Sequence, residues 1–175
     1  MEQAATIQLA LIGEVTTTLS AANLSHWLSG GWAVDFFVGA MTRPHHDIEF
    51  VVWSHDMPHI GRLLEQQAYI PIFAREDLAG WRKCGQLVEF EPIERDEHGR
   101  IVTPGRWRDW PWPARTFVAP PGHLGGLICP IVSGDVQLET KEEFSRHPAG
   151  GPPRPKDLAD IEQLRRRLAS GESAP

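Results

Sequence analysis

The segment Gly30–Phe50 reads GGWAVDFFVGAMTRPHHDIEF and contains most of the signal for the fold. Two glycines follow a short apolar run, and the residues from Trp32 to Val38 have the pattern of a helix that stops near Gly39. After a polar turn, Ile48–Trp53 is dense in β-branched and aromatic residues, which is typical of a buried strand. The order of strand, glycine pair, helix and second strand predicts a mixed α/β domain.

Two carboxylates, Asp47 and Glu49, stand one residue apart where this second strand begins. Side chains alternate between the two faces of a strand, so these acids share one face and the apolar residues beside them point to the core. A later strand, Gln86–Ile93, repeats the pattern with Glu89 and Glu91. If the two strands are neighbours in the sheet, three or four carboxylates converge, and they repel one another strongly unless a cation lies between them.

Magnesium suits such a group because it prefers oxygen ligands and is commonly shared between protein acids and substrate phosphates. Two ions about 3.5–4 Å apart support phosphoryl and nucleotidyl transfer. The glycines fit this interpretation, since the backbone N–H groups of Gly30 and Gly31 could approach a phosphate where the helix begins. Arg43, His45 and His46 precede the acids and are candidates for contacts with phosphate oxygens.

Composition limits the class of protein. The 175 residues are 41% hydrophobic and 23% charged, as in an ordinary globular chain. We expect one domain over 1–175, with a core at about 7–132 and C-terminal helices at about 133–169. The net charge of −6 disfavours nucleic acid as a partner, because binding a phosphate backbone needs a basic surface. Apolar runs fall short of the roughly 20 residues that a membrane helix needs, so the cytoplasm is the expected compartment.

The rest of the chain supplies further helices and strands around this unit. Residues 94–115 are polar and rich in proline and tryptophan, which predicts a long loop. The tail after Ser170 is expected to fray. Helices are predicted at 4–23, after an N-cap at Ser54, at 135–144 and at 156–168, and strands at 26–28, 69–74, 81–84, 86–93, 116–119 and 127–132.

At this point the sequence resembles a known family. The stretch GGWAVDFFVGAMTRPHHDIEFVV is similar to the signature G-G-W-x-x-D followed by T-R-x-H-x-D-[IL]-[DE] of the small antibiotic nucleotidyltransferases. These include the aminoglycoside 2''-nucleotidyltransferases and the lincosamide nucleotidyltransferases of the polymerase-β-like superfamily. LVEFEP at 87–92 stands where the family has its third carboxylate. VSGDVQL and RPKDLADIEQL are similar to C-terminal helices of the lincosamide branch, so the resemblance spans about residues 7–168.

The resemblance implies a nucleotidyltransferase fold, with a mixed, mostly antiparallel sheet flanked by helices and a helical C-terminus. It implies an adenylyltransferase that uses ATP or another nucleoside triphosphate, two Mg²⁺ ions and a small-molecule hydroxyl acceptor. Asp47 and Glu49 would hold the metal ions, and Glu89 would complete the metal site and accept the acceptor's proton. By the same resemblance, the nucleotide would be bound by Gly30, Gly31, Arg43, His45 and Lys156.

Several alternatives stay open at the level of the sequence. The aminoglycoside enzymes have Asp where this chain has Glu49 and Glu89, and Glu91 is the reserve candidate for the catalytic base. A polycationic aminoglycoside would fit the acids near the long loop, which are Glu91, Glu94, Asp96 and Glu97. A lincosamide would fit an apolar wall made by the tryptophans of that loop, although such residues more often cover an edge of the core.

Two further functions compete with an antibiotic-modifying enzyme. One is a toxin-like transferase that modifies RNA or protein, and the other is a non-catalytic relative that binds nucleotide. A homodimer is an expectation by analogy with relatives. Asp35, early in the predicted helix, is expected to stabilise the helix N-terminus rather than to contact substrate.

Overall fold

The computed structural model describes residues 2–170. A mixed sheet has the strand order β1-β2-β5-β4-β3, and β6 pairs with the end of β5. The β2–β5 pair is parallel, and the other pairs of this sheet are antiparallel. The strands are β1 (His26–Ser29), β2 (Asp47–Trp53), β3 (Ile70–Ala74), β4 (Ala79–Lys83), β5 (Gln86–Arg95) and β6 (Ile101–Val102), with a separate hairpin of β7 (Gly122–Leu124) and β8 (Leu127–Cys129).

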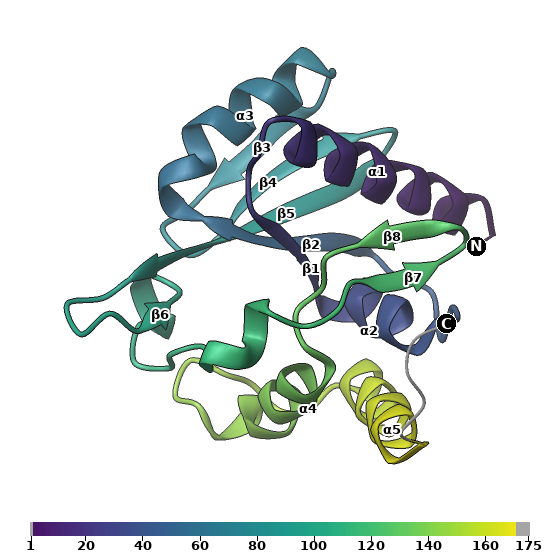
Figure 1. The fold of residues 1–175 in the computed structure, drawn as a ribbon, viewed down its shortest axis with the longest axis vertical. Helices are drawn as coiled ribbons and strands as arrows, with labels where there is room; N and C mark the ends of the chain where they lie inside the picture. The colour runs from purple at the N-terminus through teal and green to yellow at the C-terminus, as the bar shows by residue number, and fades with distance from the viewer. Residues whose placement is uncertain (1, 171–175) are drawn as a thin grey trace.

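Helices cover both faces of this sheet. Figure 1 shows α1 and α3 on one side, and α4 and α5 on the other. The helices are α1 (Glu2–Ala21), α2 (Gly30–Val38), α3 (Met57–Gln66), α4 (Gly134–Glu143) and α5 (Pro155–Ser170), and the short 3-10 helices are η1 (Ser54–Asp56), η2 (Gly105–Trp107), η3 (Ala114–Phe117) and η4 (Phe144–Arg146). The expected mixed, mostly antiparallel sheet flanked by helices is therefore confirmed.

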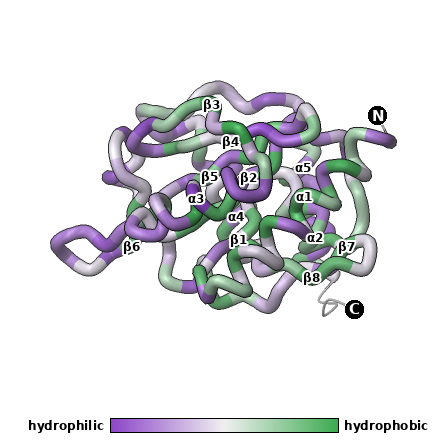
Figure 2. Tube along the Cα trace, turned by 90° about the horizontal axis from the view of Figure 1, so that it is seen from above, coloured by the Kyte–Doolittle hydropathy of each residue, from purple (hydrophilic) through white to green (hydrophobic). Residues whose placement is uncertain are grey.

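The main core lies between the sheet and the helices α1 and α3. Ile48, Phe50, Val88 and Phe90 are fully buried there, as the alternation in β2 and β5 predicts. A smaller cluster on the opposite face contains Val51, and α4 helps to cover it. Figure 2 shows the contrast in hydropathy between this buried interior and the hydrophilic loop that leads to β6. The acids of β2 and β5 therefore lie on the face that the C-terminal helices cover.

Local predictions fail where proline and glycine decide the backbone. The expected strand at 116–119 is wrong, because this segment begins in η3, where the Thr116 hydroxyl donates to the Pro113 carbonyl. Gly125 and Gly126, both at positive φ, form the turn of the unexpected β7–β8 hairpin. Ser54 is not the N-cap of α3, which begins after η1. The predicted loop 94–115 is also interrupted by β6.

Candidate active site

The parallel pairing of β2 and β5 brings the acidic residues together. In this register Glu49 lies opposite Glu89, Asp47 opposite Leu87, and Val51 opposite Glu91. Laterally paired residues point to the same face of a sheet, so Asp47, Glu49, Glu89 and Glu91 share one face. The two acidic strands are direct neighbours, as the convergence of the carboxylates requires.

Burial and mutual repulsion raise the pKa values of Glu49 and Glu89 above the ordinary value. Burial, followed by the charge of Asp47, raises the pKa of Glu49. The same two effects, burial first and then the charges of Glu49 and Asp47, raise the pKa of Glu89 to about 7. Lys156 opposes both shifts, which indicates that this residue of α5 faces the acidic strands.

Glu91 is the acid that faces inward beside the Trp-rich loop (residues 103–113). Burial raises the pKa of Glu91 to about 7, although a hydrogen bond from the Thr103 hydroxyl, at 2.5 Å, opposes the shift. Thr103 in turn accepts a hydrogen bond from the Trp112 indole N–H at 3.0 Å. This chain of contacts fixes the end of the Trp-rich loop against β5.

The glycine pair makes room for side chains of the protein itself. Gly30 has φ +61°, and a Cβ atom there would lie 1.6 Å from Oε2 of Glu49. A Cβ at Gly31 would lie 2.4 Å from Nη2 of Arg43 and 2.4 Å from Nδ1 of His45. The two glycines therefore permit the first turn of α2 to approach the acidic strand and the residues that precede it.

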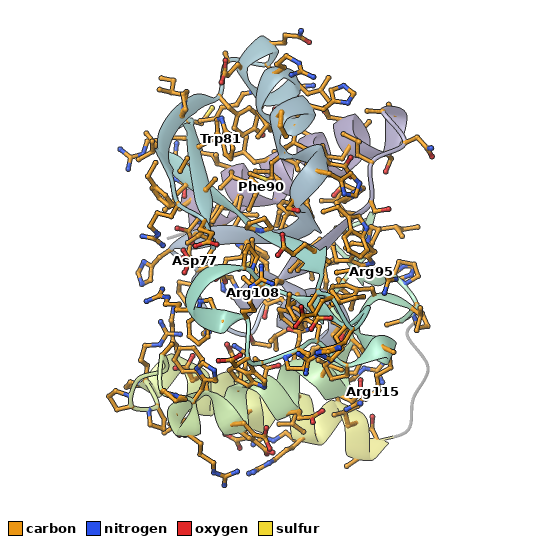
Figure 3. The ribbon with its side chains drawn as sticks, turned by 90° about the vertical axis from the view of Figure 1, so that its left-hand side faces the viewer. Asp77, Trp81, Phe90, Arg95, Arg108 and Arg115 are labelled. Atoms are coloured by element: carbon orange, nitrogen blue, oxygen red, sulfur yellow. The ribbon has the colours of Figure 1, made fainter. Side chains whose placement is uncertain are left out.

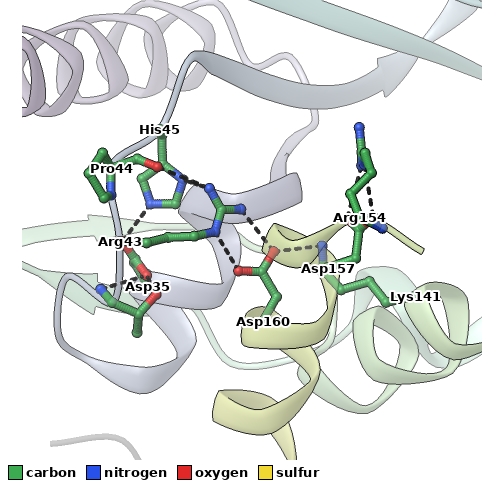
Figure 4. Close-up of polar contacts among 9 residues, drawn as sticks. Asp35, Arg43, Pro44, His45, Lys141, Arg154, Asp157 and Asp160 are labelled. Carbon is green, nitrogen blue, oxygen red and sulfur yellow. Dashed lines mark hydrogen bonds and ion pairs between the residues drawn. The ribbon is translucent and has the colours of Figure 1, made fainter. Parts of the chain in front are cut away.

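Arg43 and His45 are held by buried acids of α2 and α5, as Figure 4 shows. The Arg43 guanidinium donates two hydrogen bonds to the carboxylate of Asp160, at 2.7 and 2.9 Å. His45 Nε2 lies 2.6 Å from a carboxylate oxygen of Asp35. In this structure both side chains connect elements of the protein, and a contact of either with nucleotide stays a prediction.

The expected role of Asp35 at the start of a helix is wrong. Asp35 is the sixth residue of α2 and fully buried, and it accepts hydrogen bonds from the backbone N–H and the hydroxyl of Thr42. Together with His45, these contacts fold the polar turn after α2 onto the helix. Asp35 thus stabilises the approach to β2, which carries the acids.

Two basic residues near the acids were missed by the sequence analysis. Lys141 of α4 and Arg154, which precedes α5, both counteract the raised pKa of Glu49. Lys141 donates to Asp160 at 2.9 Å, and Arg154 donates to Asp157 at 2.8 and 2.9 Å. They lie about a hundred positions after Glu49 in the chain, so no local spacing pointed to them; with Lys156 they form the basic side of the site.

A cavity of about 300 Å³ lies between the acidic face and the C-terminal helices. Figure 3 shows Asp77 and Arg108 in the layer between the sheet and these helices, with Trp81 and Phe90 on the other side of the sheet. The acids Glu49 and Glu91 contribute to the cavity lining, and its aromatic part is made by Trp107, Trp110, Trp112 and Phe144. The tryptophans of the loop therefore form a cavity wall and do not merely cover a core edge.

Within residues 2–170, no three His, Cys, Asp or Glu side chains are gathered closely enough to hold a metal ion. In the same described part of the chain, none of the helices combines the length and the apolar character that crossing a membrane requires.

Solved structures share this fold over nearly the whole chain. The solution structure of the antibiotic-resistance factor ANT(2'')-Ia matches with a TM-score of 0.75 at 17% identity, covering 94% of this chain and 86% of that chain. ANT(2'')-Ia in complex with adenylyl-2''-tobramycin matches with 0.75 at 16%, covering 94% and 91%. The lincomycin-bound lincosamide antibiotic adenylyltransferase LnuA matches with 0.66 at 19%, covering 94% and 96%. At these identities the likeness establishes the fold alone.

Sequence relatives agree with the structural ones. A 2''-aminoglycoside nucleotidyltransferase of Klebsiella pneumoniae is 41% identical over 44 residues, and one of Escherichia coli matches equally. The matched segment is 25% of this chain and spans only 25% of the length of these curated relatives. The model of the aminoglycoside-2''-adenylyltransferase family matches residues 11–164, which is most of the chain. The chain therefore belongs to the aminoglycoside-2''-adenylyltransferase family.

Proposed function

We propose that this protein is a magnesium-dependent adenylyltransferase that moves a nucleoside monophosphate from ATP to a hydroxyl group of a small, antibiotic-like molecule. The observation that carries the proposal is the β2–β5 register, with Glu49 beside Glu89 and Asp47 on the same face. This acidic face borders a cavity on one side and the basic residues of α4 and α5 on the other. Membership of the family supports the same reaction.

The donor atoms suit magnesium. Asp47, Glu49 and Glu89 offer only oxygen. The raised pKa values of the two glutamates reflect burial first and then a mutual repulsion that a cation relieves. Because residues 2–170 hold no gathered ligand set, these side chains must reorient to share an ion. We assign them as ligands of two Mg²⁺ ions, which when bound would neutralise the charge that the acids and a triphosphate bring together.

Glu89 is proposed as the base. A carboxylate with a pKa of about 7 is suited to accept a proton near neutral pH. The hydroxyl proton of the acceptor passes to Glu89 as the acceptor oxygen bonds to the α-phosphorus. The bond from that phosphorus to the bridging oxygen breaks, and pyrophosphate leaves with the electron pair. Glu91 is the second candidate, because it lines the cavity where an acceptor would lie.

The triphosphate is proposed to lie between the acids and the basic side of the site. Lys156, Lys141 and Arg154 offer positive charge there, since each of them lowers the pKa of Glu49. Gly30 and Gly31 open α2, and the N–H groups of its first turn suit a phosphate oxygen. Such a site holds the nucleotide and the acceptor in line, and positioning of this kind contributes much of the rate in transfers of phosphorus centres.

The test combines turnover with product analysis. Purified protein is incubated with labelled ATP, Mg²⁺ and a panel of aminoglycosides and lincosamides, and pyrophosphate release and product mass are measured. We expect an adenylylated antibiotic that is lost in Asp47→Asn and retained in Asp56→Asn, a matched acid at the end of η1. Label on RNA or protein would support a toxin-like transferase. Tight ATP binding without transfer to any acceptor would contradict the proposal and favour a non-catalytic relative.

Two further expectations concern the oligomeric state of the protein and its location in the cell. A homodimer and a cytoplasmic location, where ATP is available, are part of the proposal. Sedimentation equilibrium of the purified protein tests the first, and fractionation of expressing cells tests the second.

A further inference from the structure

The cavity beside the acids has an aromatic wall, defined here as the rings of Trp107, Trp110 and Phe144, and His147 packs against the two tryptophans. The Trp110 ring stacks on His147 with centroids 5.0 Å apart and planes 14° from parallel. The ring centroid of Trp107 lies 5.1 Å from that of His147 and 5.6 Å from that of Phe144. Rings held by one another in this way present a preformed apolar surface, which favours ligands that have an apolar face.

The carboxylates near the cavity are largely engaged. In the described part of the chain, the acids that line it are Glu49, Asp77 and Glu91. Arg106 donates to Asp77 at 2.9 Å, and Arg75 donates to the same side chain at 3.4 Å. Glu91 accepts a hydrogen bond from the Thr103 hydroxyl. Glu49 lies near the positive charges of Lys141 in α4 and Lys156 in α5.

Two of the other acids near the loop are paired with arginines, and Glu97 is 86% exposed and lies 3.6 Å from His98. Glu94 accepts a hydrogen bond from Arg108, and Asp96 accepts from Arg100 at 2.7 Å. The sequence suggested that the acids near the loop could attract a polycation, and the structure shows that arginines of the same region already engage Glu94 and Asp96. A polycation placed in this cavity would lose hydration at several ammonium groups without gaining a carboxylate for each, and that loss is costly.

From these contacts we propose that the acceptor is a neutral or singly charged hydroxylated glycoside that lays an apolar ring face on Trp107 and Trp110. The inference rests on the proposed function and narrows it, since it selects among acceptors for the same hydroxyl transfer. The cavity of about 300 Å³ is of a size that holds a small ligand or one ring system of a larger one. A polycationic acceptor is then the poorer substrate, although the family is described by its action on aminoglycosides.

Equilibrium binding tests the inference separately from turnover. Lincomycin, a singly charged glycoside, and tobramycin, a polycation, are titrated into the purified protein while tryptophan fluorescence and isothermal calorimetry are recorded. We expect lincomycin to bind at least about tenfold more tightly than tobramycin, a difference of about 1.4 kcal/mol. The affinity of the protein for lincomycin should change by less than about twofold between low and high salt, because salt screens charge attraction rather than apolar contact.

Variants of the aromatic wall sharpen the test. Trp110→Ala should weaken lincomycin binding by about tenfold, and Trp110→Phe, which keeps a ring, should restore most of that loss. Trp53→Phe is the matched control, because Trp53 stacks on His55 and is not among the residues that line the cavity in the described chain. Melting curves of each variant verify that the fold is intact.

The outcomes separate the two proposals. Tighter, salt-sensitive binding of tobramycin would overturn the inference, and adenylylation of tobramycin would then leave the proposed function in place. Lincomycin binding that is unchanged in Trp110→Ala, or binding of neither probe, would also overturn the inference. Selective lincomycin binding without pyrophosphate release would support the inference about the cavity and count against the proposed transfer.

Discussion

Replacing Asp160 by Asn is expected to weaken the polar contacts that hold the C-terminal helices against the segment before the acidic strand β2. The Asp160 carboxylate is 1% exposed and accepts two hydrogen bonds from Arg43, at 2.7 and 2.9 Å, and one from Lys141, at 2.9 Å. Arg43 in turn packs under Gly31. The variant keeps the shape of the side chain but leaves two cations without their shared negative charge.

The magnitude follows from the burial of the partners. Removing one member of a buried ion pair costs about 3–5 kcal/mol. The Arg43 and Lys141 side chains are 16% and 15% exposed, so water recovers part of their solvation, and we expect a loss at the lower end, about 3 kcal/mol. For a chain of this size, such a loss lowers Tm by about 6–12 °C.

Urea and thermal unfolding, followed by circular dichroism, measure the effect. Glu142→Gln is the matched control, because its partner Arg165 is 65% exposed, and such surface pairs contribute at most about 1 kcal/mol. A Tm of Asp160→Asn within about 1 °C of the parent protein would refute the reasoning.

The pH dependence of the same variant provides a second readout. Burial alone would raise the pKa of Asp160, but the hydrogen bond from Arg43 and the charge of Lys141 lower it below its ordinary value of 3.8. A lowered folded-state pKa contributes stability that is present above the ordinary value and is lost as pH falls through the folded value. Asp160→Asn should therefore show a shallower loss of stability in acid than the parent protein.

Three further predictions concern the glycine pair and the acidic strands. Gly31→Ala should lower the free energy of unfolding in urea by about 1–3 kcal/mol, because its Cβ would lie 2.4 Å from atoms of Arg43 and His45. Gly151→Ala is the control and should leave stability unchanged, because its Cβ meets no atom of residues 2–170 within 4 Å. Equal urea midpoints for the two variants would contradict this prediction. Glu89→Gln should lower kcat by about 10²–10⁴-fold at saturating ATP and Mg²⁺, and an unchanged kcat would exclude Glu89 as the base. Without metal, Glu89 and Glu91 have raised pKa values of about 7 each, so they stabilise the folded state below their ordinary pKa of 4.5, and this contribution is lost as pH rises through 7. In EDTA, Tm should therefore fall as pH rises over this window, and Mg²⁺ should restore it. A Tm that does not change with pH would argue against the acidic cluster.

Much of the fold was predictable from local pattern. The alternation in β2 and β5 assigned Ile48, Phe50, Val88 and Phe90 to the core, because successive side chains of a strand point to opposite faces. The same alternation assigned the acids to the other face. The glycine pair also marked the change from strand to helix, since β1 ends at Ser29 and α2 begins at the next residue.

Short elements were less predictable, because proline and glycine torsions decided them. The hairpin of β7 and β8 depends on two glycines at positive φ, and both of its strands are only three residues long. Windows of that length carry little periodic signal. The same limit explains why the pattern at 116–119 wrongly predicts a strand.

The sequence by itself determined which side chains share a face, since that property depends only on the spacing of residues along one strand. Only the tertiary structure decided that β5 pairs in parallel with β2, which places Glu49 opposite Glu89, and that Lys141 and Arg154 approach these acids. It also decided that Arg43 meets Asp160, 117 positions away, and that the tryptophans line a cavity. The physical reason is that side-chain alternation is a local consequence of backbone geometry, whereas strand register and helix packing depend on which distant surfaces bury the most apolar area together.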